Sequence, residues 1–82
     1  MTYKQFLELD IFSRIEITIQ KGIVIGKRLE HDTFLKLYRL GSFYVELCFA
    51  EDLSEVFALD SADTERLLDP YLNAIDISEL FE

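Results

Sequence analysis

The chain has 82 residues, half of them hydrophobic and 13% aromatic, with a formal net charge of −8. This length predicts one domain over residues 1–82, and the apolar content excludes a disordered or low-complexity chain. Residues 1–50 hold six acidic and seven basic side chains, whereas residues 51–82 hold ten acidic and one basic, so the acidic half disfavours nucleic acid and anionic membranes as partners.

A short helix is predicted at the start of the chain. Thr2 and Gln5 have the spacing of a capping box, in which the Thr2 hydroxyl accepts from the backbone of Gln5. Tyr3, Phe6 and Leu7 follow at helical spacing. We therefore expect a helix over about residues 3–9.

Residues 10–20 allow two interpretations. Ile15, Ile17 and Ile19 alternate with polar residues, which is typical of a half-buried strand. Apolar residues also recur every four positions through this stretch, at 7, 11, 15 and 19, and would continue a helix to Gln20. The strict alternation favours the strand, and the helix remains the alternative.

Three turns divide the following residues into strands. Lys21-Gly22 precedes "IVIGKRLEH", in which Gly26 indicates a bulge or a close approach of backbone. A turn around His31-Asp32 leads into "TFLKLYRL". Gly41-Ser42 then forms a two-residue loop that begins with Gly, which suits the type II′ turn of a β-hairpin.

The loop at Gly41-Ser42 predicts the register of its hairpin. The inner face pairs Leu40 with Phe43, Tyr38 with Val45, Lys36 with Leu47 and Phe34 with Phe49. The Lys36 stem can lie along apolar surface while its amine reaches water. The outer face carries Leu35, Leu37, Arg39, Tyr44, Glu46 and Cys48. On that face we expect Arg39 and Glu46 to lie diagonally within reach of each other.

The acidic half adds an edge strand at "EVFALD" and then a helix. Asp60 or Ser61 is the predicted N-cap, and Pro70 should kink the helix or restart it with Asp69 as a second cap. The expected buried stripe is Leu67, Leu68, Tyr71, Leu72 and Ile75, and the tail after it could add one more turn on the core.

These elements predict an α+β fold. An antiparallel meander of four or five strands has a short N-terminal helix and a C-terminal helix, and we expect the helices from both ends on the inner face. The outer face is too apolar to be a surface that is simply exposed to water. Either the N-terminal segment or a second copy of the chain should cover it.

The sequence offers no catalytic constellation. "GIVIGKR" is one residue short of a phosphate-binding loop, and Arg28 replaces the hydroxyl that would hold Mg²⁺. His31 is the only histidine, and Cys48, the only cysteine, has no basic neighbour to activate its thiol. The acidic residues do not match a Ca²⁺ loop. We therefore expect no enzyme activity, no metal site and no cofactor.

The location expected for the chain is the cytoplasm. A single cysteine forms no internal disulfide, which fits a reducing compartment. No apolar run approaches the roughly 20 residues that span a bilayer, and no export signal is visible, so we expect no membrane association.

The leading functional hypothesis is a small interaction module that binds a protein partner or a second copy of itself. Its contact residues would be the outer-face set Leu35, Leu37, Arg39, Tyr44, Glu46 and Cys48. The alternative is a nucleic-acid-binding module that uses Lys27, Arg28, Lys36 and Arg39. The net charge of −8 disfavours this alternative.

The segments "GIVIGKR", "LYRLGSFYVEL" and "LLDPYLNAID" resemble a family of small uncharacterised bacterial proteins with an LY-x-L-x-x-FYVE pattern. The resemblance covers about residues 10–77. It implies a stand-alone small domain, and it carries over no functional residue because no activity is known for that family.

Overall fold

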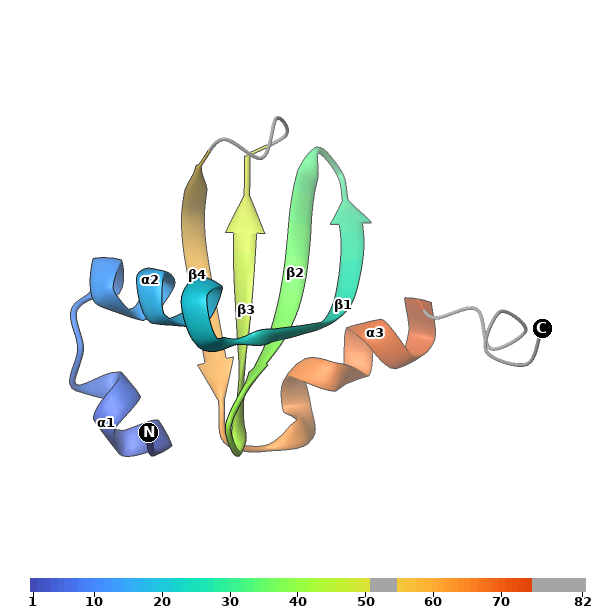
Figure 1. Cartoon of the computed structure of the whole chain (residues 1–82). Coiled ribbons are helices and arrows are strands. Elements are labelled where there is room, and N and C mark those ends of the chain that lie inside the picture. The colour runs from blue at the N-terminus through green and yellow to red at the C-terminus, as the bar shows by residue number, and fades with distance from the viewer. Residues whose placement is uncertain (51–54, 75–82) are drawn as a thin grey trace.

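The computed structural model describes residues 1–50 and 55–74, which form a four-stranded antiparallel sheet with helices on both faces (Figure 1). The helical elements are α1 (Tyr3–Leu7), α2 (Ile11–Lys21), the 3₁₀ helix η1 (Glu65–Leu68) and α3 (Asp69–Ala74). The strands are β1 (Ile23–Glu30), β2 (Thr33–Leu40), β3 (Phe43–Phe49) and β4 (Val56–Ala62), and they neighbour one another in chain order. The predicted α+β meander is confirmed.

Helix α1 begins with the predicted capping box. The Thr2 hydroxyl accepts from the Gln5 backbone N–H at 3.1 Å, and the Gln5 side chain accepts from the Thr2 backbone N–H at 2.9 Å. The helix ends at Leu7, two residues before the expected end. Arg14 secures the corner that follows, since its guanidinium donates to the carbonyl oxygens of Leu7 and Leu9 at 2.6 and 2.9 Å.

The strand predicted over residues 10–20 is wrong, because these residues form helix α2. Asp10 caps this helix, and its carboxylate accepts from the Ser13 backbone N–H at 2.8 Å. Thr18 is fully buried against the sheet, and its hydroxyl donates to the Arg14 carbonyl at 2.7 Å. Packing of one side on the sheet thus overrides the weak helix propensity of β-branched residues.

The β1–β2 hairpin turns at His31 and Asp32. His31 has a φ of 57°, in the left-handed region that favours glycine. Along β1 the register shifts between Val24 and Gly26, which confirms the bulge that the glycine predicted.

The β2–β3 hairpin has the predicted register in every pair, from Leu40 opposite Phe43 to Phe34 opposite Phe49. Gly41 has a φ of 67°, the positive value that a type II′ turn requires at its first loop residue. The Lys36 amine lies 5.2 Å from the centroid of the Phe49 ring, so its stem follows the apolar face as expected.

The helical segment after β4 starts later than predicted. Asp60 and Ser61 belong to β4, and Thr64 caps η1 by accepting from the Arg66 backbone N–H at 3.4 Å. Pro70 lies in the first turn of α3, where η1 gives way to an α-helix, so the predicted restart is confirmed. Ile75 and the predicted final turn lie outside the described residues.

The N-terminal and C-terminal helices lie on opposite faces of the sheet. We call the face under α1 and α2 the front, and the face under η1 and α3 the back. The front core joins Phe6 to the predicted inner face, namely Tyr38, Leu40, Phe43, Val45, Leu47 and Phe49. The back core consists of Leu37, Ala62, Leu67 and Tyr71. The expectation that both helical ends share the inner face is therefore corrected.

Within residues 1–50 and 55–74, every helix is too short or too polar to cross a bilayer.

Candidate functional site

The six outer-face residues do share one face, the back of the sheet. The register pairs Leu35 with Cys48, Leu37 with Glu46, and Arg39 with Tyr44. Leu35, Leu37 and Glu46 are buried, Tyr44 and Cys48 are half-buried, and Arg39 is exposed. Within this chain the cover is η1 and α3, and not the N-terminal segment. Three of the six predicted contact residues are thus buried within the chain itself.

Arg39 and Glu46 do not bind each other. The Arg39 guanidinium donates to the carbonyl oxygen of Gly41 at 3.1 Å. Glu46 instead accepts from Arg28 at 3.4 Å and from the Tyr71 hydroxyl at 2.7 Å. The Arg28 guanidinium also contacts Glu30 and lies 5.4 Å from the centroid of the Tyr71 ring. This cluster attaches α3 to the back of the sheet.

The sequence analysis missed the role of Tyr71 in this cluster, although Gly26 was a signal for it. A Cβ atom at residue 26 would lie 2.6 Å from Cδ1 of Tyr71, so the glycine admits the ring. Burial and the hydrogen bond to Glu46 raise the pKa of the Tyr71 hydroxyl well above its usual value. Tyr71 therefore stays protonated and keeps donating at neutral pH.

Cys48 lies at the edge of a small cavity on the back, of about 290 Å³, lined by Arg28, Glu30, His31, Thr33, Leu35, Cys48 and Phe57. Burial raises the pKa of the Cys48 thiol, which lowers its thiolate fraction at neutral pH. In the part of the chain that the structure describes, no three His, Cys, Asp or Glu side chains are placed to hold a metal ion.

The four basic residues of the nucleic-acid hypothesis are divided between the two faces. Lys27 and Lys36 pair opposite each other on the front. Arg28 and Arg39 point to the back, where Arg28 is bound to two glutamates. No single basic surface joins the four.

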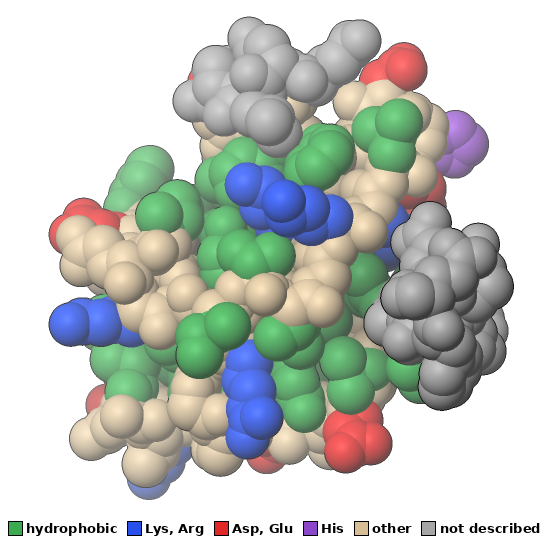
Figure 2. Space-filling view, turned by 45° about the vertical axis from the view of Figure 1, so that its right-hand side comes forward, with side chains coloured by type: hydrophobic (Ala, Val, Ile, Leu, Met, Phe, Trp, Pro, Cys, Tyr) green, Lys and Arg blue, Asp and Glu red, His purple; other side chains and the backbone are tan. Residues whose placement is uncertain are grey.

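The largest exposed apolar side chains gather on α2 and β1. These two elements carry seven of the eleven exposed large hydrophobic residues in the described chain. Phe12 on α2 is 78% exposed and Leu29 on β1 is 69% exposed. We define the α2–β1 surface as Phe12, Ile19, Val24, Ile25 and Leu29 together with Lys27 and Lys36. Figure 2 shows hydrophobic side chains around separate Lys and Arg groups on this side of the molecule.

Strand β1 makes this surface unusual for a sheet edge. It lies at one end of the strand order and is eight residues long, and most of its side chains are exposed. Natural edge strands are ordinarily short or charged, because an exposed apolar edge invites pairing with other chains. Strand β1 is longer and more apolar than such an edge.

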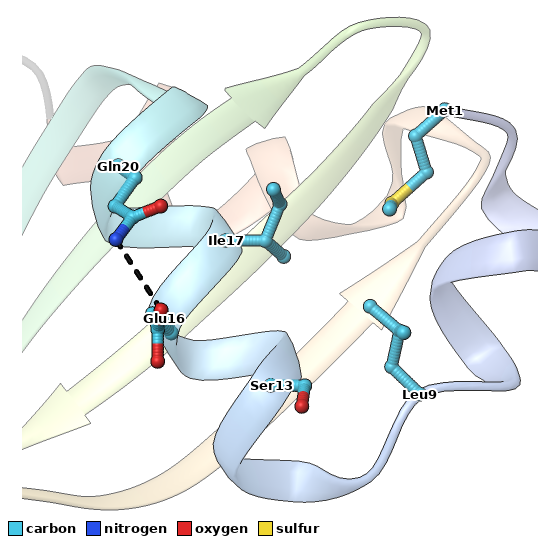
Figure 3. Close-up of a pocket in the computed structure, with 6 residues that line it drawn as sticks. All are labelled: Met1, Leu9, Ser13, Glu16, Ile17 and Gln20. Atoms are coloured by element: carbon cyan, nitrogen blue, oxygen red, sulfur yellow. Dashed lines mark hydrogen bonds between the residues drawn. The ribbon is translucent and has the colours of Figure 1, made fainter.

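A hollow lies on the other side of α2, between this helix and the N-terminus. One cavity of about 250 Å³ is lined by Met1, Leu9, Ser13, Glu16, Ile17 and Gln20. Figure 3 shows Met1, Leu9 and Ile17 around it, with the Gln20 amide donating to Glu16 at 3.3 Å. A second hollow of about 380 Å³ shares Met1 and Ile17 and reaches Leu40 and Gly41. Both are apolar depressions that Met1 and Ile17 of α2 line together, with polar groups at the rim.

No protein-family model matches the chain, and no curated protein or solved structure matches it. The resemblance based on the LY-x-L-x-x-FYVE pattern therefore stays a prediction.

Proposed function

We propose that the chain is a non-enzymatic interaction module that binds a protein partner through the α2–β1 surface. The observation that carries this proposal is the concentration of exposed apolar side chains on α2 and β1, with Phe12 and Leu29 the most exposed. Isolated apolar residues are normal on a protein surface, whereas a contiguous apolar group marks an interaction site or a risk of aggregation.

The polar clusters of the chain support a non-enzymatic role. Arg28, Glu46 and Tyr71 bind one another beneath α3, where their hydrogen bonds serve the packing of that helix. The Cys48 thiol has a raised pKa, opposite to the shift that activates a nucleophile. Self-association through Leu35 and Leu37 would require α3 to leave the back, so the proposed contact surface moves to the front.

Site-specific photo-crosslinking in the producing cell tests this function. A benzophenone side chain replaces Phe12 in one variant and Phe57 in another. Phe57 is a matched control, since it is 59% exposed but lines the cavity on the back of the sheet, the face opposite α2. We expect discrete adducts from position 12 that disappear when Leu29→Ser is added, and none of these adducts from position 57.

Two results contradict the proposal. One is the absence of any adduct from position 12. The other is the same adduct pattern from positions 12 and 57, because non-specific contact would produce it. An adduct of twice the mass of the chain would identify the partner as a second copy.

A further inference from the structure

Helix α2 covers only part of the front face. It contacts β2 and β4, and Figure 1 shows it crossing the strands near their middle. Toward the turn at His31, β1 and β2 have no described helix in front of them. On this part of the front, Phe34 is half-buried and Leu29 is exposed. Sheets of small domains bury such faces under helices, so the front layer is incomplete here.

The side of α2 next to this uncovered part is apolar. Phe12, Ile15 and Ile19 follow at helical spacing along one side of the helix. Ile17 lies on the opposite side, where it meets Met1 and Leu9 near α1 (Figure 3). The last turn of α2, which contains Ile19, lies toward β1 and β2, whereas its first turn, which contains Phe12, lies beside β4 (Figure 1). The uncovered part of the sheet and the neighbouring side of α2 therefore meet at an angle, and both present apolar side chains there.

The charged side chains that the strands present on this face are all lysines. Lys27 and Lys36 lie opposite each other on the front, and no ion pair joins either of them to a described residue. Every acidic residue within the four strands, namely Glu30, Glu46 and Asp60, points to the back. A chain of net charge −8 thus has two lysines on this face that pair with no described carboxylate, and the described strands place no acidic side chain beside them.

We propose that this part of the surface binds an amphipathic helix of a partner protein, with an apolar stripe on Leu29, Phe34 and Ile19 and with Asp or Glu residues beside Lys27 and Lys36. The inference rests on the proposed function and adds the chemical class of the partner. A helix lying beside α2 would complete the front layer, and helix-in-groove recognition uses apolar anchors three and four residues apart. Carboxylates next to those anchors would neutralise the two lysines.

Other occupants fit the charges less well. A two-fold contact of this face with a second copy would bring each lysine pair toward the same pair of the other chain. An anionic bilayer is far wider than a helix, so it would also meet the acidic side chains around the surface. A helix is narrow enough to contact the front alone.

Peptide selection on the full chain tests the inference. Random peptides of about 16 residues, some four turns of helix, are displayed on phage and selected against the wild type and against Lys27→Glu/Lys36→Glu. We expect the wild type to select peptides with apolar residues three and four apart and with an acidic excess. The charge-reversed variant should select peptides with a basic excess.

Affinity measurements then locate the binding. A labelled peptide selected by the wild type should bind Lys27→Glu/Lys36→Glu at least about tenfold more weakly, because two close charge pairs become repulsive. The matched control is Lys4→Glu/Arg39→Glu, which changes the net charge equally at two other exposed positions and should alter the Kd by less than about twofold.

The remaining outcomes separate this inference from the proposed function. Two kinds of selected peptide would overturn the helix proposal and leave the interaction module standing. One kind binds through Phe12 and Leu29 but has no acidic excess. The other has apolar residues at every second position, as a strand added to β1 would. Peptides whose binding survives Phe12→Ser and Leu29→Ser overturn both. If the chain floats with phosphatidylglycerol vesicles and Lys27→Glu/Lys36→Glu abolishes this flotation, the surface binds a membrane. If the chain sediments as a dimer and the same variant is a monomer, the surface binds a second copy. Either result would overturn the helix proposal.

Discussion

The ring of Tyr71 occupies the space that a side chain at Gly26 would need. A Cβ atom at residue 26 would lie 2.6 Å from Cδ1 and 3.1 Å from Cε1 of the ring. Contact between one turn of α3 and the middle of β1 therefore depends on the missing side chain. The hydroxyl of the same ring donates to Glu46, so the contact between the ring and Gly26 also positions this hydrogen bond.

Gly26→Ala should destabilise the chain by about 1–3 kcal/mol, the usual cost of overpacking. The added methyl group displaces the Tyr71 ring and weakens its hydrogen bond to Glu46. Urea unfolding followed by circular dichroism measures the change. In a Tyr71→Ala background the same substitution should cost much less, since the clashing ring is gone. An equal cost in both backgrounds would show that Tyr71 does not lie over Gly26 in solution.

The stability of the wild type should fall above about pH 10. Burial and the bond to Glu46 raise the pKa of the folded Tyr71 above that of the unfolded chain, so the folded state holds its proton more tightly. The stabilisation is complete below the unfolded pKa and is lost as the pH rises toward the folded pKa, by at most about 1.4 kcal/mol per pH unit.

Tyr71→Phe isolates this contribution, because burial also raises the pKa of Tyr38 and both tyrosines act in the wild type. Near pH 7 the variant should lose about 1–2 kcal/mol through the missing hydrogen bond. Between pH 10 and 12 its unfolding free energy should fall less steeply than that of the wild type. Parallel pH profiles of the two proteins would contradict the buried donor.

The sheet could be predicted from the sequence because its signals are local. Gly41 and Ser42 determine one turn, that turn determines the register of β2 and β3, and the register determines which side chains share a face. Gly26 likewise predicted a bulge and a close contact with its backbone, although the sequence did not identify Tyr71 as the residue in contact.

The nature of residues 11–21 could not be predicted, because two periods coincide there. Ile15, Ile17 and Ile19 alternate as in a strand, yet in α2 Ile17 lies on the side opposite Ile15 and Ile19. Ile17 faces the hollow at Met1, whereas Ile19 is exposed. Exposed apolar residues thus hid the helical period, and the cap at Asp10 was the better signal.

The identity of the cover on the back face depends on contacts between distant parts of the chain. Leu37 and Tyr71 are 34 positions apart, and the alternation of β2 and β3 indicates only that both faces need covering. The partner of Glu46 was missed for the same reason. Its neighbour Arg28 comes from β1, beyond the hairpin that the turn at Gly41 determines.

His31→Gly should raise the unfolding free energy by up to about 1 kcal/mol. His31 holds a φ of 57°, which is strained for a residue with a Cβ atom and relaxed for glycine. His31→Val should instead destabilise by about 1–2 kcal/mol, because a β-branched side chain tolerates positive φ least. Asp32→Gly is the control in the same turn. Asp32 has no positive φ, so Asp32→Gly should not raise the unfolding free energy measured by thermal or urea unfolding. A gain at residue 32 and none at 31 would contradict the turn geometry.

Leu37→Glu should unfold the chain or destabilise it by more than about 3 kcal/mol. Leu37 is fully buried between the sheet and the residues Ala62, Leu67 and Tyr71, so a carboxylate there would be desolvated without a partner. Leu29→Glu introduces the same charge at an exposed position of β1 and should change the unfolding free energy by less than about 0.5 kcal/mol. Urea titration of both variants measures the contrast. If Leu37→Glu unfolded like the wild type, η1 and α3 would not cover the back face in solution, and the outer-face residues would again be available to a partner.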